Sequence, residues 1–137
     1  MSNFQKYKSG LNSVGSYQLS SRPYLTSSLT VPASTDDPLE ISFDNVSSFV
    51  IITNTTPGNL SNIALRFGFS ENGIKGVGDN NYGILNNGES FEAKFRVTSL
   101  FLLSDSTSEC SGSVIAGLTG IESQELASNW SGSVGVG

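Results

Sequence analysis

Side chains able to carry out catalysis are few in this 137-residue sequence, and none of them stands at a recognised catalytic spacing. There is no histidine, which removes the usual general base near neutral pH, the Ser-His-Asp and Cys-His arrangements, and imidazole metal ligands. A Ser-Lys pair remains as a chemical option, but no lysine has a recognisable spacing from a serine. We therefore predict that the protein is not an enzyme. The lysines are Lys6, Lys8, Lys75 and Lys94.

The acidic side chains are placed for turns rather than for proton transfer or metal binding. Asp36 and Asp37 are adjacent in a loop segment, where neighbouring side chains point apart instead of sharing a proton. The glycine-rich stretch 70–81 offers oxygen atoms that suit calcium, but the D-x-[DN]-x-[DN]-G spacing of a calcium loop is absent. We predict no metal site, with calcium in this loop as the minor alternative. Its oxygen ligands would come from Glu71, Asn72, Asp79, Asn80 and Asn81.

Glycine and cysteine give no stronger indication of a cofactor. The sequences GVG at 76–78 and GSVGVG at 132–137 resemble parts of phosphate-binding loops, but neither joins a strand to a helix or carries the lysine of a P-loop. Cys110 is the single cysteine, which excludes an intrachain disulfide. It stands in a predicted turn without a basic neighbour, so we interpret it as a free, unactivated thiol. We predict no cofactor.

Charge and hydropathy argue against nucleic acid and membrane as partners. Seven basic and twelve acidic residues give a net charge of −5, and there is no basic run to neutralise phosphates. No window approaches the roughly 18 consecutive apolar residues of a transmembrane helix. Residues 1–10 also lack the apolar stretch of a signal peptide. We predict no direct contact with nucleic acid and no membrane segment.

Glycan attachment and glycan binding are alternatives that the sequence supports less well. Four N-x-S/T triplets would be sugar attachment sites in a secretory pathway, but such triplets also arise by chance in a chain rich in Ser and Thr. They begin at Asn45, Asn54, Asn59 and Asn129. Tyr82, beside the glycine-rich loop, would suit stacking on a bound sugar, although a place in the core is the favoured interpretation.

Period-two hydrophobicity indicates that strands make up the body of the chain. Apolar and other residues alternate in the segments 39–43, 63–69 and 91–97, which is typical of strands buried on one face. Two further segments, 49–53 and 100–103, are apolar on both faces and should be covered on both sides. We expect the second cover to be a crossing arm of the chain or a neighbouring subunit.

The number and spacing of these strands predict an all-β fold. Further strands are expected at 24–31, 82–85 and 113–118, separated by turn-forming segments and without a helical period between them. This pattern favours an antiparallel β-sandwich, with a single eight-stranded jelly roll as its best-fitting member. The predicted parts are an N-terminal arm at 1–22, the β-sandwich domain at 23–121 and a C-terminal arm at 122–137.

The arms carry aromatic residues that have little of their own to pack against. Trp130 is the single tryptophan and lies in a Gly/Ser-rich tail, where burying about 150–250 Å² of aromatic surface would offset the entropy lost on docking. The surface it docks on is either its own sandwich or a neighbour, and we favour the neighbour. The predicted assembly contacts are Tyr17, Tyr24, Trp130 and Val134.

Several segments together resemble small virion proteins of icosahedral double-stranded DNA viruses. They are GLNSVGSYQLSSRPYLTSS at 10–28, LEISFDNVSSFVIITN at 39–54, LRFGFSENG at 65–73, VIAGLTGI at 114–121 and NWSGSVGVG at 129–137. The resemblance implies a single jelly roll in the virion, serving as a minor capsid protein, a penton or a decoration subunit. It also implies other capsid proteins as partners and a homo-oligomer. No functional residue is carried over, and a carbohydrate-binding host-attachment module is the alternative.

Overall fold

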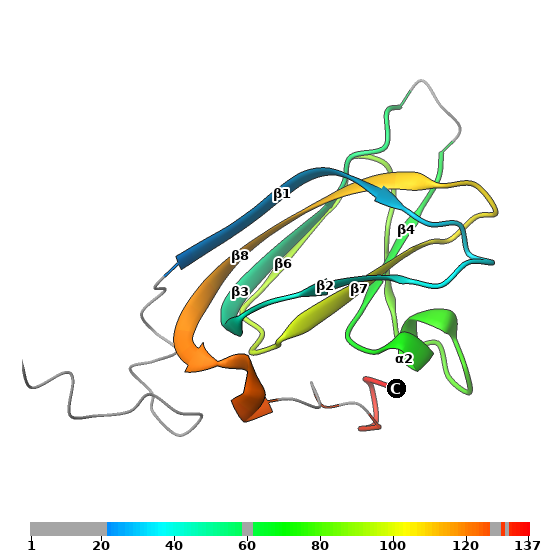
Figure 1. Cartoon of the computed structure of the whole chain (residues 1–137). Coiled ribbons are helices and arrows are strands. Elements are labelled where there is room, and N and C mark those ends of the chain that lie inside the picture. Colours follow the sequence, from blue (N-terminus) through cyan, green and yellow to red (C-terminus); the bar gives the residue numbers. More distant parts are fainter. Residues whose placement is uncertain (1–21, 59–61, 127–129, 131) are drawn as a thin grey trace, which may run out of the picture.

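The fold is a sandwich of two antiparallel β-sheets (Figure 1). The computed structural model of the chain describes residues 22–58, 62–126, 130 and 132–137. Within them are eight strands, one short α-helix and one 3-10 turn. The prediction of an all-β antiparallel sandwich is therefore confirmed.

Each sheet has four strands. The first sheet has the order β1-β8-β3-β6 and the second sheet has the order β2-β7-β4-β5. Every connection between consecutive strands crosses from one sheet to the other, except that β4 and β5 are neighbours in the second sheet. The strands of the first sheet are β1 (Arg22–Val31), β8 (Cys110–Glu122), β3 (Asn45–Asn54) and β6 (Ser90–Ala93). Those of the second sheet are β2 (Leu39–Ser42), β7 (Ser99–Ser104), β4 (Leu65–Gly68) and β5 (Gly83–Leu85).

The core lies between the inner faces of the two sheets. Alternate residues of each strand point inward, as the period-two pattern predicts. In the segment 63–69, Ile63, Leu65 and Phe67 are buried, and the Phe67 ring stacks on Phe91 of the opposite sheet with centroids 4.6 Å apart. The main inward residues of the other long strands are Val50, Ile52, Leu100, Leu102, Val114 and Ala116.

The predicted strand at 91–97 is shorter than expected, because its backbone leaves the ladder after Ala93. The hydroxyl of Ser47 on β3 donates to the carbonyl of Phe95 and accepts from the amide of Val97, with an N–O distance of 3.1 Å in the second bond. The backbone amide of Ser47 also donates to the carbonyl of Val97 at 2.9 Å, so the backbone and the side chain of Ser47 together hold this segment against β3. Val97 returns to the core, but Phe95 turns outward and is 38% exposed.

Other hydroxyls complete the ladder in the same way, which explains how a chain rich in Ser and Thr forms a well-paired sandwich. Thr26 Oγ1 bonds both the amide and the carbonyl of Val114, at 3.1 and 3.2 Å. Thr119 Oγ1 donates to the carbonyl of Val46 at 2.7 Å and accepts from the amide of Ile121 at 3.2 Å. Where Thr26 does this, β1 bulges, and its register with β8 shifts before Leu29.

The cover of the second sheet differs from the expectation. A short helix, α2 (Glu71–Lys75), packs over the outer face of β4 and β7. Ile74 of α2 and Leu103 of β7 are both fully buried. The prediction that an arm or a neighbour covers 100–103 is therefore wrong, because the β4–β5 connection of the same chain supplies the cover. The outer face of β3 has no such helix within the described residues, and Phe49 and Ile51 stay half-buried.

The sandwich extends one residue beyond each predicted boundary. Arg22 already pairs with Leu118 in β1, and Glu122 is the last residue of β8. A 3-10 turn, η2 (Ser123–Leu126), follows directly. The rest of the predicted N-terminal arm, residues 1–21, lies outside the described residues. Of the helices that the described part contains, none has the length and apolar character needed to cross a bilayer.

Candidate functional site

Residue types at both ends of α2 account for a helix of only five residues. Ser70 is extended, with φ −145°, and its hydroxyl accepts from the amide of Gly73 at 3.0 Å, which is the bond of an N-cap serine. Glu71 and Lys75 pair across one turn, with Nζ and Oε1 3.1 Å apart. Gly76 ends the helix in the left-handed region, at φ 76°.

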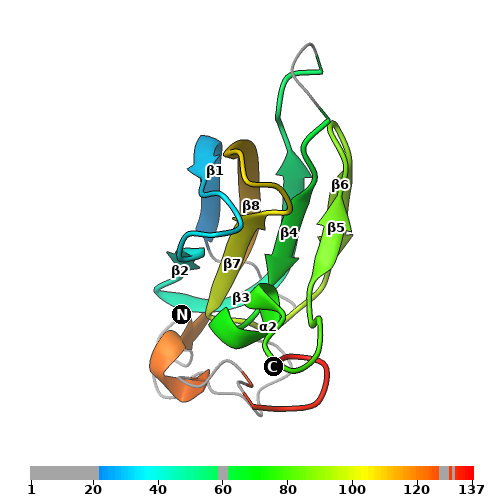
Figure 2. The same ribbon diagram turned by 90° about the vertical axis from the view of Figure 1, so that its right-hand side faces the viewer.

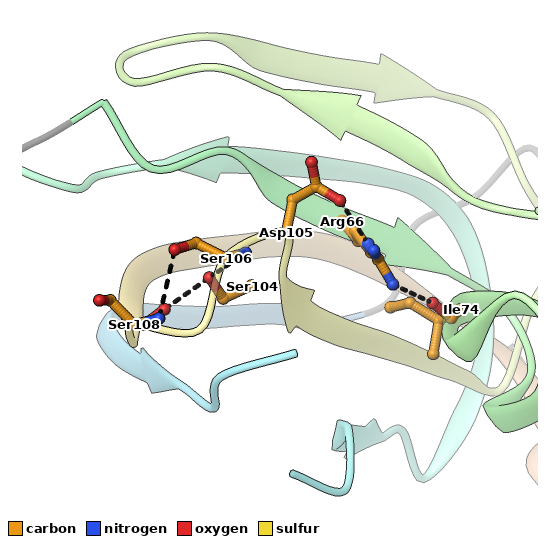
Figure 3. Close-up of polar contacts among 6 residues, drawn as sticks. All are labelled: Arg66, Ile74, Ser104, Asp105, Ser106 and Ser108. Atoms are coloured by element: carbon orange, nitrogen blue, oxygen red, sulfur yellow. Dashed lines mark hydrogen bonds and ion pairs between the residues drawn. The ribbon is translucent and has the colours of Figure 1, made fainter. Parts of the chain in front are cut away.

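Arg66 of β4 holds this helix against the second sheet (Figure 3). Its Nε donates to Asp105 Oδ1 at 2.7 Å, and its Nη1 donates to the carbonyl of Ile74 in α2 at 3.3 Å. The guanidinium also lies over the ring of Tyr82, 4.5 Å from its centroid. One half-buried cation thus connects β4, α2, Tyr82 and the loop after β7.

The C-terminal tail lies beside α2 (Figure 2). Ser70 Oγ donates to the carbonyl of Val136 at 2.8 Å while it still caps the helix. Gly73 and Gly137 meet without side chains between them: a Cβ on Gly73 would lie 2.2 Å from the carbonyl oxygen of Val136, and one on Gly137 would lie 2.6 Å from Gly73 Cα. The end of the tail therefore fits a surface that only glycine leaves open.

An aromatic pocket of about 370 Å³ lies next to the docked tail. Phe69 and Phe95 meet edge to face, with centroids 5.3 Å apart, and Trp130 closes the rim with 49% of its surface exposed. Lys94 and Arg96 add cationic side chains to the lining. This pocket suits an apolar or aromatic group that also carries negative charge.

The predicted assembly residues are not brought together. Tyr24 packs edge to face on Phe43 in its own core, with centroids 4.9 Å apart. Trp130 lies in the pocket rim, whereas Val134 is fully exposed, and Tyr17 is outside the described residues. In the single chain the described tail contacts its own sandwich through a close backbone fit at Gly137, for which the sequence gives no periodic signal. Docking of the tail on a neighbour stays a prediction.

A surface that the sequence indicated only in part, through the doubly apolar segment 49–53, lies on the outer face of the first sheet. Leu25 of β1 pairs with Ile115 of β8, and Ile115 pairs with Ile51 of β3, so the three form one row across the sheet. Leu25 is 68% exposed, Ile115 is 38% exposed and Ile51 is half-buried. We call these three residues the outer row. A period-two pattern does not predict the outer row, because the row depends on which strands become neighbours.

In the loop considered for calcium, the carboxylate of Glu71 is engaged in an ion pair with Lys75. Lys75 Nζ lies 3.1 Å from Glu71 Oε1 and 3.3 Å from Asp37 Oδ1. These hydrogen bonds, first to Glu71 and then to Asp37, raise the pKa of Lys75. Across the described ranges, no three acidic or thiol side chains gather where they could hold a metal ion. Asp37 is otherwise exposed, in the turn predicted for Asp36 and Asp37.

Cys110 is a strand residue rather than a turn residue. It opens β8 opposite Val31 and is buried in the core. Burial raises the pKa of its thiol, against smaller opposing contributions from hydrogen bonds with Ser104 and Thr56. Its placement agrees with an unactivated thiol.

Asn54, one of the four predicted sugar attachment sites, is instead a buried structural residue. Its Nδ2 donates to the carbonyls of Ile63 and Leu85, both at 2.9 Å, and its Oδ1 accepts from the amide of Thr56. The side chain has no exposed surface in the folded protein. A sugar on it would have to break these bonds, so this triplet is structural.

The lectin-like alternative centres on Tyr82, which lines a cleft of about 270 Å³ with Asn80 and Asn81. The amide groups of the two asparagines suit sugar hydroxyls. One face of the Tyr82 ring, however, is already covered by Arg66. Stacking of a sugar would therefore be restricted to the other face.

Comparison with known proteins does not assign this chain to a family. No family model matches the sequence. A search of curated proteins likewise finds no match.

Proposed function

We propose that this chain is a structural subunit of a virion, built on a single jelly roll and acting as a minor capsid, penton or decoration protein. The observation that carries the proposal is the strand order. With strands numbered along the chain, a jelly roll pairs 1-8-3-6 in one sheet and 2-7-4-5 in the other, and this is the order of the two sheets here. The resemblance of the sequence to small virion proteins agrees with that topology.

The outer row supports assembly through the first sheet. Leu25 and Ile115 are large apolar side chains that stand adjacent and exposed on a face that no described element covers. Exposed apolar patches of this kind mark interaction surfaces in soluble proteins. We assign this face to contacts with further copies of the chain and with other capsid proteins.

The net charge of −5 supports a place away from the packaged genome. A subunit that lines nucleic acid needs basic side chains to neutralise phosphates, and this chain has an acidic excess. An outer position or one between subunits follows for the proposed role.

Oligomer size tests the assembly role directly. The purified chain should form a homo-oligomer by size-exclusion chromatography with light scattering. The double variant Leu25→Lys/Ile115→Lys should be monomeric with an unchanged circular dichroism spectrum. The control Ile84→Lys changes an exposed isoleucine on β5 of the other sheet, 44% exposed, and should remain oligomeric. A wild-type chain that stays monomeric at every concentration would overturn the assembly role.

Location in the virion needs a separate test. Antibodies raised against the purified chain should label intact icosahedral particles from the source of the sequence in immuno-electron microscopy. Label found only outside particles would contradict the proposal, whatever the oligomer size.

The second candidate is a carbohydrate-binding attachment module. Two features favour it: the cleft of about 270 Å³ beside Tyr82 and Asn81, and the larger aromatic pocket at Trp130. A glycan array probed with the purified chain would decide. Binding lost in Asn81→Ala or Trp130→Ala would support this candidate over a purely structural role.

A further inference from the structure

We infer that the surface on which the C-terminal tail lies is an exchange site, which binds the same tail from a second copy of this chain. The tail groove is defined here by Phe69, Ser70, Gly73 and Phe95, and the tail by residues 130 and 132–137. This inference deepens the proposed function, on which it depends for its biological setting. The binding event itself is tested with the purified chain alone.

The contacts in the tail groove are selective for this particular tail. Ser70 Oγ donates to the carbonyl of Val136, and the Gly73 backbone contacts Gly137 so closely that neither residue has room for a Cβ. Such a fit requires glycine on both surfaces. A second copy of the chain carries the matching end, because its sequence is identical, so the groove that accepts one tail accepts the other.

The tail is built to move as a unit. Its amides at Val136 and Gly137 both bond the carbonyl of Ser133, at 3.0 and 3.1 Å, and the amide of Gly132 bonds the carbonyl of Gly137. These bonds lie within the tail and survive transfer to another groove. Val134 stays fully exposed, so its side chain does not tie the tail to the sandwich.

Concentration decides which groove the tail occupies. A short connection gives the chain's own groove an effective concentration in the millimolar range, so a dilute chain keeps its tail. Subunits packed in a shell reach comparable local concentrations, and exchange then becomes competitive without any new contact. Residues 127–137 span at most roughly 36–40 Å when extended, which is enough to reach an adjacent copy.

Two complementary variants test this with full-length chains. Gly73→Ala blocks the groove, since its Cβ would lie 2.2 Å from the Val136 carbonyl oxygen, but leaves the tail intact. Gly137→Ala blocks the tail but leaves the groove intact. Each variant alone should be monomeric when Leu25→Lys/Ile115→Lys is also present. An equimolar mixture near millimolar concentration should approach the mass of two chains in sedimentation velocity.

Trp130 reports where the tail lies, because it is the only tryptophan. With Trp130→Phe in the Gly137→Ala partner, all the fluorescence comes from the tail donor. Emission of the Gly73→Ala chain should lie to the red of wild type and return toward it as the partner is added. The control Gly58→Ala, at a glycine where a Cβ meets nothing within 4 Å, should keep the wild-type spectrum and should not recruit the partner.

Each result either supports or overturns exchange of the tail between copies. Heterodimers together with the blue shift support exchange. A red-shifted Gly73→Ala chain that never forms heterodimers shows that the groove takes only its own tail, which overturns the inference. An unchanged spectrum in both Gly73→Ala and a Gly137→Ala chain that retains Trp130 overturns it as well, because the tail would then not occupy the groove. Gly137→Ala changes the tail and not the sandwich, so it still reports whether the tail occupies the groove should Gly73→Ala fail to fold. None of these results bears on oligomers formed through the outer row.

Discussion

The outer faces of the two sheets differ in whether a described element of the chain covers them. On the second sheet, α2 buries Leu103, and Arg66 fixes the helix in place. On the first sheet, Leu25 and Ile115 remain exposed in the outer row. Both faces bear large apolar residues, but the part of the chain that the structure describes covers only the outer face of the second sheet. The difference separates residues that stabilise the fold from residues available for association.

The contrast has an origin in the connections. The β4–β5 link spans 69–82 and carries enough residues to place a helix over β4 and β7. No described connection passes over the outer face of β1, β8 and β3. Whether an apolar residue on the outer face of a strand is buried therefore depends on which connections pass over that face, and not on the residue type.

Truncation of leucines on the two faces should give the largest difference. Leu103→Ala removes a fully buried side chain and should lower the free energy of unfolding by about 3 kcal/mol, through lost burial and a cavity. Leu25→Ala, at 68% exposure, should change it by less than about 0.5 kcal/mol in the monomer. Urea denaturation of both variants measures this. Equal losses would mean that the first sheet is also covered.

An intermediate difference in lost stability is expected between substitutions of Arg66 and Arg22. Arg66→Leu breaks the half-buried pair with Asp105, the bond to the Ile74 carbonyl and the stacking on Tyr82, so about 1–2 kcal/mol of stability should be lost. Arg22→Leu on β1 breaks an exposed pair with Asp44 and should cost about 0–0.5 kcal/mol. Thermal unfolding at low ionic strength compares them. The idea that Arg66 holds the cover in place fails if the two losses are alike.

The smallest effect on stability is expected for Cys110, which is buried in the core between the two sheets. Burial raises the pKa of Cys110, so the folded protein retains the thiol proton that the unfolded chain releases above its ordinary pKa of about 8.5. The contribution to stability is present below that pH and is lost as the pH rises through the raised value. The stability difference between wild type and Cys110→Ala should therefore shrink between about pH 8 and 10. A constant difference across this range would indicate an exposed thiol.

Much of the sandwich was predictable because period-two patterns record burial directly. Leu65 and Phe67 point inward as expected, and the doubly apolar segment at Leu103 correctly indicated a strand covered on both sides. The identity of the cover was not predicted, because a five-residue helix is too short to show a period. Its signals were nevertheless present: a serine cap at Ser70 and a left-handed glycine at Gly76.

The candidate sites were less predictable, since they depend on residues distant in sequence. Gly73 and Gly137 come within contact only after the sheets have formed, and nothing in their local sequence pairs them. The outer row likewise requires the register of β1, β8 and β3. Trp130 was identified as an anchor from its isolation in a Gly/Ser tail, but that composition does not specify whose surface it meets.

The bulge in β1 also shortens the regular edge of the first sheet. β1 lies at the edge of the first sheet, and a long free edge is a template for strands of other molecules. Ser28 has a left-handed backbone, at φ 55°, and divides the regular pairing into Arg22–Thr26 and a second stretch from Leu29. Neither stretch reaches the roughly six or seven residues typical of amyloid-forming segments. The bulge thus limits the length of regular edge that β1 offers to a strand of another molecule.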